Sequence, residues 1–306
     1  MNSRSQMEKG SSSSSSSSSA TATTKNAIAG FANFVKVVFL RKKAAKIGSA
    51  IILFYAILII LGPNLVPYSP YATSASINSP PSASHLLGTD YLGHDVLSQV
   101  IWGAYPSMIV AILAAIGGAL LGLIVGVFAG YFSKIEGALT GISDIVLTFP
   151  PLPLLVLVGL LYAGASSLLV LILILVLWPP IARAVRSQIL SVKNRPYVDA
   201  ARSSGLSDFE IIKEIMIPSV ASITFAYFVL NVAVAVILVT GLEYFGIGNP
   251  EIVSWGSMFY WAQQFAFYSG DWWWIFAPGI AVTTVATAFA LIGFSVEEIA
   301  NPRLRV

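Results

Sequence analysis

The chain has 306 residues, of which 56% are hydrophobic and only 10% are Asp, Glu, Lys or Arg, and its formal net charge is +3. Soluble domains use about 45–50% apolar residues, so a water-soluble fold of this composition would expose large apolar patches and is excluded. The complete absence of cysteine also excludes disulfides and thiolate metal sites.

The first 46 residues form a region of their own. A serine run at 11–19 has nothing to bury and predicts a disordered cytosolic tail. Behind it, residues 31–39 place several apolar side chains on one helical face, and basic residues follow at 41–46. This pattern fits a short helix lying in the headgroup layer, and it fits a cytosolic lead-in to the first membrane crossing equally well.

The apolar stretches predict an all-α membrane protein with six transmembrane helices. Each crossing needs about 20 mostly apolar residues. The uncharged stretch between Asp144 and Arg183 would be about 57 Å long as one helix, so we divide it at YAGASS, residues 162–167. The six expected spans are 47–66, 106–130, 142–161, 167–186, 220–242 and 272–296. The expected regions are the tail at 1–46, the first helix with an outer segment at 47–105, and a five-helix core at 106–306.

Lys and Arg predict the orientation in the membrane. All 17 of them fall in four segments, at 1–46, 131–138, 183–218 and 297–306. The opposite segments, at 67–105, 162–166 and 243–271, contain acidic residues but no Lys or Arg. We therefore expect a multi-pass protein of the cell membrane with both termini in the cytoplasm.

Glycine recurs at every fourth position of the second span. The row consists of Gly118, Gly122, Gly126 and Gly130. This spacing places the four residues on one helix face, where another backbone can approach closely. The partner helix belongs either to this chain or to another subunit.

The segment 194–218 is unusually polar and predicts a rigid helix–turn–helix. We expect Asn194 to cap the first helix and Gly205 to end it as a left-handed residue. Ser207 and Glu210 form a capping box that opens a second helix, which we expect to stop at Pro218. A loop that merely joined two crossings would be short and flexible, so this segment predicts a docking surface.

The sequence DAARSSGLSDFEIIKEIMIP resembles the EAA loop of the permeases of ATP-binding-cassette importers. The matching positions are Asp199, Ala200, Ala201, Gly205, Ile215 and Pro218. Asp199 stands where the family usually has Glu, and Ile217 where it usually has Leu. The resemblance implies that these residues, together with Leu206, form a coupling loop that contacts an ATPase subunit.

Other stretches resemble the dipeptide and oligopeptide branch of these importers. They are LLGTDYLGHDVLSQVIWGA at 86–104, WPPIARAVRSQIL at 178–190, LEYFGIG at 242–248, SWGSM at 254–258 and NPRLR at 301–305. In this chain His94 takes a place usually held by Arg. Val239 takes the place of a usual Glu, and Glu243 lies nearby with a different geometry.

This resemblance implies the permease fold of type I importers. It implies a complex with a second homologous permease subunit, two ATPase subunits and an extracellular substrate-binding protein, with lipid around the helices and no nucleic acid. ATP and Mg²⁺ would sit on the ATPase subunits, so no cofactor is expected on this non-catalytic chain. The cargo implied is di- or oligopeptides or oligosaccharides.

A few polar residues within or near the spans are candidates for other roles. Candidates for lining the pathway are Asn231, Thr240, Thr283 and Thr287, although threonine also bonds back to its own helix. Asp144 is expected to pair with the basic group at Arg183 and Arg186, and the weaker alternative is that it lines the pathway. The alternative of a metal site formed by His85, His94, Asp90 and Asp95 is weaker than a structural role.

The competing function is a secondary transporter or channel that acts alone. Such proteins carry acidic coupling sites deep in the membrane, whereas the later spans here contain almost no acid. They also have no need of the helix–turn–helix at 194–218. The sequence has no GxxxxGK[ST] or HExxH motif either, so we favour the importer permease.

Overall fold

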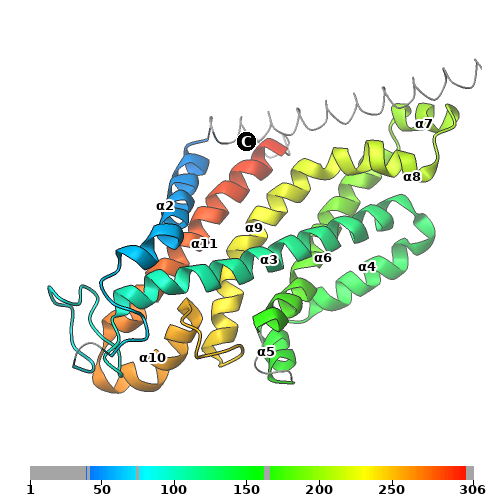
Figure 1. Ribbon diagram of the computed structural model, residues 1–306. Coiled ribbons are helices and arrows are strands. Elements are labelled where there is room, and N and C mark those ends of the chain that lie inside the picture. Colours follow the sequence, from blue (N-terminus) through cyan, green and yellow to red (C-terminus); the bar gives the residue numbers. More distant parts are fainter. Residues whose placement is uncertain (1–38, 40–41, 74–75, 162–165, 301–306) are drawn as a thin grey trace, which may run out of the picture.

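The computed structural model describes residues 39, 42–73, 76–161 and 166–300 of the chain (Figure 1). Within these residues the secondary structure is helical, with no strand beyond an isolated bridge between Thr89 and Asp95. The expected all-α architecture is therefore confirmed. Nearly all of the predicted tail, most of the break at 162–167 and the NPRLR segment lie outside the described residues.

The helices differ in length and in how well they match the expected spans. In chain order they are α2 (Lys43–Leu65), α3 (Val96–Tyr131), α4 (Ser133–Thr148), α5 (Pro151–Leu161), α6 (Ser166–Lys193), α7 (Pro196–Ser203), α8 (Asp208–Ile211), the π-helical turn η1 (Ile212–Met216), α9 (Ile217–Tyr244), α10 (Trp255–Ser269) and α11 (Trp272–Ala300). Five helices are long and apolar enough to cross a membrane, namely α2, α3, α6, the continuous helix Asp208–Tyr244 and α11. A sixth crossing is completed if α4 and α5 together form one span.

The third expected span is broken rather than straight. Residues 142–161 are divided between α4 and α5, which meet at an angle of 89°. Phe149 between them is extended, with φ −82° and ψ 136°. The cause is Pro150, because proline pushes the residue before it out of the helical region and lacks an amide proton for the helix ladder.

Helix α3 begins in a segment that the sequence predicts to be an outer loop, and helix α10 lies entirely within another such segment. Helix α3 starts at Val96 rather than at 106, because the Asp95 side chain caps it by accepting from the Ser98 backbone N–H at 2.8 Å. Helix α10 lies inside the segment 243–271. Its capping box is formed by Ser254 and Ser257, and it ends at the left-handed Gly270.

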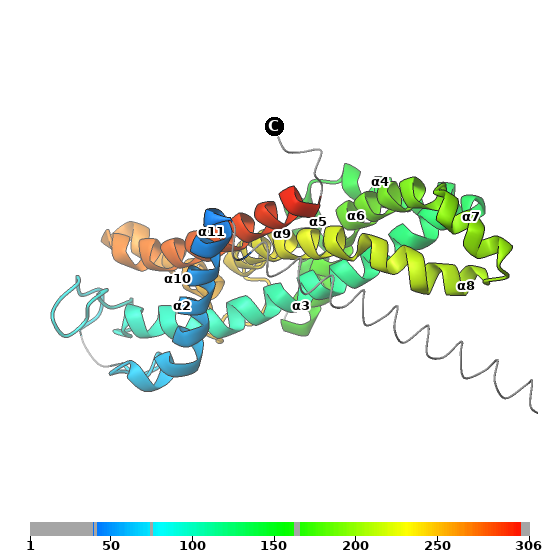
Figure 2. The same ribbon diagram turned by 90° about the horizontal axis from the view of Figure 1, so that it is seen from above.

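The core is a packed group of α3, α6, α9 and α11, and α2 crosses it at a steep angle against α11 and α3 (Figure 2). The glycine row of α3 lies against α6. A Cβ on Gly122 would meet the Trp178 carbonyl oxygen at 2.7 Å, and one on Gly126 would meet the Ala182 carbonyl oxygen at 2.7 Å. The partner helix of the row therefore lies in this chain, where close packing replaces the hydrophobic effect that lipid does not provide.

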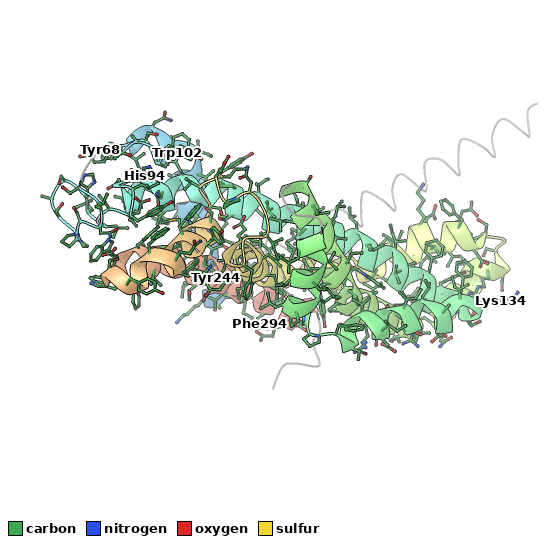
Figure 3. All side chains as sticks on the ribbon, turned by 90° about the horizontal axis from the view of Figure 1, so that it is seen from below. Tyr68, His94, Trp102, Lys134, Tyr244 and Phe294 are labelled. Atoms are coloured by element: carbon green, nitrogen blue, oxygen red, sulfur yellow. The ribbon has the colours of Figure 1, made fainter. Side chains whose placement is uncertain are left out.

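The molecule has two distinct ends. Helices α7 and α8 and the turn from α3 to α4 lie at one end, which we call the α7–α8 end (Figure 1). Helix α10 and the loop before α3 lie at the opposite end, which we call the α10 end. Figure 3 shows Tyr68, His94 and Trp102 near each other at the α10 end and Lys134 at the other.

Candidate functional site

The segment 194–218 folds as a helix–turn–helix, and its turn is a Schellman motif. Gly205 has φ +89°, its N–H donates to the Arg202 carbonyl at 3.0 Å, and the Leu206 N–H donates to the Ala201 carbonyl at 3.2 Å. A left-handed glycine with this pair of hydrogen bonds satisfies the last carbonyls of α7 and sets the angle of the turn. The predicted role of Gly205 as the helix terminator is confirmed.

Of the two helix caps expected in this segment, one is correct and the other is wrong. The capping box of α8 is confirmed, because the Ser207 hydroxyl accepts from the Glu210 N–H and the Glu210 carboxylate accepts from the Ser207 N–H. Asn194 does not cap α7, and its side chain instead donates to the Leu190 carbonyl at 3.3 Å. The N-cap is Arg195, because Pro196 occupies the first helical position and holds the residue before it extended.

The second helix of this segment does not stop at Pro218. It continues through η1 into α9, and the Ile217 N–H donates to the carbonyl five residues earlier, on Ile212. The wider π turn supplies the extra residue that lets the chain pass a proline without a break. As a result α8, η1 and α9 form one continuous helix, Asp208–Tyr244.

Two aromatic side chains are exposed on this segment. Phe209 is 74% exposed and Tyr197 is 54% exposed, although both lie among charged residues. Asp199, Ala200 and Gly205 are exposed as well, while Ala201, Leu206 and Ile215 are partly buried against the core. Sequence reasoning missed Phe209, whose only signal was an apolar residue in a polar turn of the capping box. An exposed aromatic side chain is typical of a protein-binding surface.

Tyr131, the last residue of α3, connects this segment to the helix core. Its side chain is buried, and its hydroxyl donates to Asp208 at 2.6 Å and accepts from Arg202 at 3.3 Å. The same hydrogen bond raises the pKa of the Arg202 guanidinium. The Lys193 ammonium donates to the Tyr131 backbone carbonyl at 2.5 Å and lies 5.5 Å from the ring centroid. One residue thus touches α6, α7 and α8.

Ion pairs join α4 to α6 near the same end. Arg183 pairs with Asp144 at 2.7 Å, which confirms the expected role of that acid, and Arg186 pairs with Glu136. The first pair is mostly exposed and the second is less so. The two pairs join α4, which follows the α3–α4 turn, to α6, which leads into the segment 194–218.

The four candidate pathway residues lie in two different environments. Asn231 is buried and donates to the Leu177 carbonyl at 2.8 Å, and buried Thr240 donates to the Val236 carbonyl of its own helix. Thr283 and Thr287 are exposed on α11. The Asn231 hydrogen bond joins α9 to α6, whereas the Thr240 hydrogen bond lies within α9.

The two histidines of the loop before α3 are paired with acids. His85 lies 2.9 Å from Asp95, and His94 lies 2.9 Å from Asp90, which also accepts from Gln99. Among the residues that the structure describes, no three His, Asp or Glu side chains come together as a metal site. The pairing holds the loop before α3 in place and matches the structural role expected for it.

Comparison with known proteins gives two family matches. Residues 118–306 match the family described as binding-protein-dependent transport system inner membrane component. Residues 36–81 match the N-terminal TM domain of oligopeptide transport permease C.

Several curated relatives are similar over most of their length. A putative peptide transport system permease protein of Brucella suis biovar 1 (strain 1330) is 32% identical over 275 residues, which cover 87% of this chain and 90% of the relative. The dipeptide transport system permease protein DppC of Bacillus subtilis (strain 168) is 31% identical over 268 residues, covering 87% and 83%. A putative peptide permease protein of Brucella ovis is 30% identical over 270 residues, covering 87% and 89%.

Proposed function

The chain belongs to the family of binding-protein-dependent transport system inner membrane components, and on that basis we propose that it is a permease subunit of an ATP-driven peptide importer. The peptide permeases among its relatives support this cargo. In the proposal, this chain and a second homologous permease subunit each form half of the translocation pathway. An external binding protein delivers the solute, and two ATPase subunits that hold ATP and Mg²⁺ supply the energy.

We propose that the α7–α8 end is the coupling element seated on an ATPase subunit. Exposed Ala200 allows close seating, and Phe209 offers an apolar anchor. Reversing a 1:99 population of two transporter states needs roughly 5.5 kcal/mol of differential stabilisation. A contact that transmits such an energy has to be stiff, and the Schellman turn and the capping box make it so.

The proposed orientation places the α7–α8 end and both termini in the cytoplasm. The support is the distribution of basic residues, because the segments at the α10 end contain no Lys or Arg while 183–218 contains six. The ATPase subunits of the proposal act in the cytoplasm, so the charge distribution and the docking role agree.

The observation that carries the proposal is the junction at Tyr131. It joins the docking segment to the end of α3, and α3 packs along α6 and α9 through the core. A displacement of α7 and α8 is therefore passed to the helices that would form the pathway.

Two substitutions in the docking segment test the coupling role. Gly205→Pro forces φ to about −65° where the turn requires a positive φ, and Ala200→Trp adds a bulky side chain on the exposed face. In the complete complex in proteoliposomes, each should lower peptide uptake by at least about tenfold while ATP hydrolysis continues, as a loss of coupling energy predicts. Uptake and hydrolysis are measured on the same preparation.

The matched control is Ala50→Trp, because Ala50 is an exposed alanine on α2, outside both the segment 194–218 and the α10 end. It should leave the ratio of uptake to hydrolysis unchanged. Wild-type uptake by both docking-segment variants would overturn the coupling role.

A further inference from the structure

A groove at the α10 end is lined by apolar and aromatic side chains around one acid. Its volume is about 440 Å³, which lies within the range of about 300–1,000 Å³ typical of small-molecule sites. Its walls come from α2, the segment between α2 and α3, α3 itself, the end of α9 and the segment 249–253. The lining residues used below are Tyr71, Trp102, Tyr105 and Glu243.

Glu243 is held in a fixed position at the edge of this groove. Its carboxylate accepts from the Ser254 hydroxyl at 2.8 Å. A Cβ on Gly256 would lie 2.3 Å from the same carboxylate oxygen, so the absence of a side chain at Gly256 allows the first turn of α10 to approach it. The acid is therefore preorganised, and its position requires no rearrangement when a ligand arrives.

No basic residue of the described chain balances this acid. Glu243 takes part in none of the ion pairs that the described residues form, and the groove lining contains no Lys, Arg or His. The segments around it, 67–105 and 243–271, contain no Lys or Arg at all. A carboxylate withdrawn from water without a cation is costly, so a cation that arrived beside Glu243 would supply the missing partner.

The aromatic side chains of the groove are a second feature that favours a positively charged ligand. Tyr71, Trp102 and Tyr105 are each partly exposed along the groove. The faces of aromatic rings attract cations, and an acid beside such rings is a combination that suits an ammonium group. Both observations point to one class of ligand.

We propose that Glu243 and this groove bind the primary ammonium group of the solute on its way through the transporter. The inference rests on the proposed function for the identity of the solute, whose ammonium belongs either to a peptide amino terminus or to a lysine side chain. A lipid chain or an apolar face of a second subunit would fill the groove but would leave Glu243 without a cation. The charge therefore favours the solute.

The test titrates peptides into the complete membrane complex in nanodiscs without the binding protein, so that selection by that protein does not enter. The probes are trialanine, N-acetyl-trialanine and N-acetyl-alanyl-lysyl-alanine, and binding is measured by calorimetry. Glu243→Gln keeps the shape and still accepts from Ser254, but it removes the charge. It should weaken binding of the peptides with an ammonium group by about tenfold or more, as expected for a charge-assisted hydrogen bond.

The acetylated probe and a second variant distinguish an effect of the lost charge from an effect of the substitution on the structure. Binding of N-acetyl-trialanine should be equal in wild type and Glu243→Gln. Ser254→Ala removes the hydrogen-bond partner and keeps the charge, so the preference for ammonium peptides should persist. The lysine probe distinguishes the two sources, because it binds like trialanine only if a side-chain ammonium is accepted.

The outcomes also separate this inference from the proposed function. Equal weakening of all three probes, or no binding in wild type because another subunit covers the groove, would overturn the ammonium site. ATP-dependent uptake of trialanine by the wild-type complex is a separate measurement. If uptake occurs and Glu243→Gln changes no preference, the ammonium site fails and the importer role stands. If charge-dependent binding is found without any peptide uptake, the importer role fails alone.

Discussion

The two ends of the protein hold their polar groups in different ways. At the α10 end, the pairs His85–Asp95, His94–Asp90 and Gln99–Asp90 join residues only 10, 4 and 9 positions apart. At the α7–α8 end, Tyr131 is joined to Asp208, Arg202 and Lys193 over 77, 71 and 62 positions.

This difference predicts a different mechanical role for each end. The local pairs fix the shape of the loop before α3, which is also joined to α11 where the Trp273 indole donates to the Thr89 carbonyl at 3.2 Å. Long-range pairs make three helices move together, because displacing any of them breaks contacts with the others. We therefore expect the acid–histidine pairs to stabilise one loop, whereas the α7–α8 end acts as a joint between three helices.

The largest expected effect is at Asp95. Asp95→Ala removes the N-cap of α3 and leaves His85 and the Ser98 N–H without their buried partner, which should lower the free energy of unfolding by roughly 3 kcal/mol. Hydrogen exchange of residues 76–95 should rise, and exchange of α7 and α8 should not. Glu251→Ala is the matched control, because that acid is exposed, and its effect should stay within about 0.5 kcal/mol. An equal rise at both ends would show that the two regions unfold as one unit.

A smaller effect on stability but a larger one on coupling is expected at Tyr131. Tyr131→Phe keeps the ring and removes the hydroxyl shared by Asp208 and Arg202, which should cost about 1–2 kcal/mol because part of the network is exposed. The ratio of uptake to ATP hydrolysis should fall in the reconstituted complex. Tyr268→Phe, at a position that is 92% exposed, should leave that ratio unchanged. A normal ratio in Tyr131→Phe would show that the joint is formed elsewhere.

The sequence alone predicted the features that depend on local interactions. The capping box at Ser207, the left-handed Gly205 and the glycine row of α3 each depend on residues within a few positions or on one repeating distance. The break in the third span had a local signal too, in the prolines at 150, 151 and 153. Residues 142–161 were nevertheless expected to form one straight span, because the whole stretch is apolar enough for a single helix.

The remaining features depend on contacts between distant segments. Nothing in the sequence indicates that Tyr131 meets Asp208, or that Glu243 lies against the first turn of α10. The π turn before Pro218 is equally hidden, and it lies where Met216 and Val220 pack in the core. Family resemblance predicted the docking segment, and the structure added how it is attached.

The smallest expected effect tests whether stiffness of the docking segment matters in itself. Ser207→Ala removes the hydroxyl that caps α8, and the loss of an N-cap typically costs about 1 kcal/mol. Ser204→Ala is the matched control, because Ser204 only bonds back to the Ala200 carbonyl within α7. If α7 and α8 act as a rigid joint, fraying of α8 should lower uptake per ATP in the first variant and leave it unchanged in the second. Equal ratios in both variants would mean that the long-range contacts of Tyr131 carry the coupling without help from the cap, and the local and long-range interactions of this end would then have separate roles.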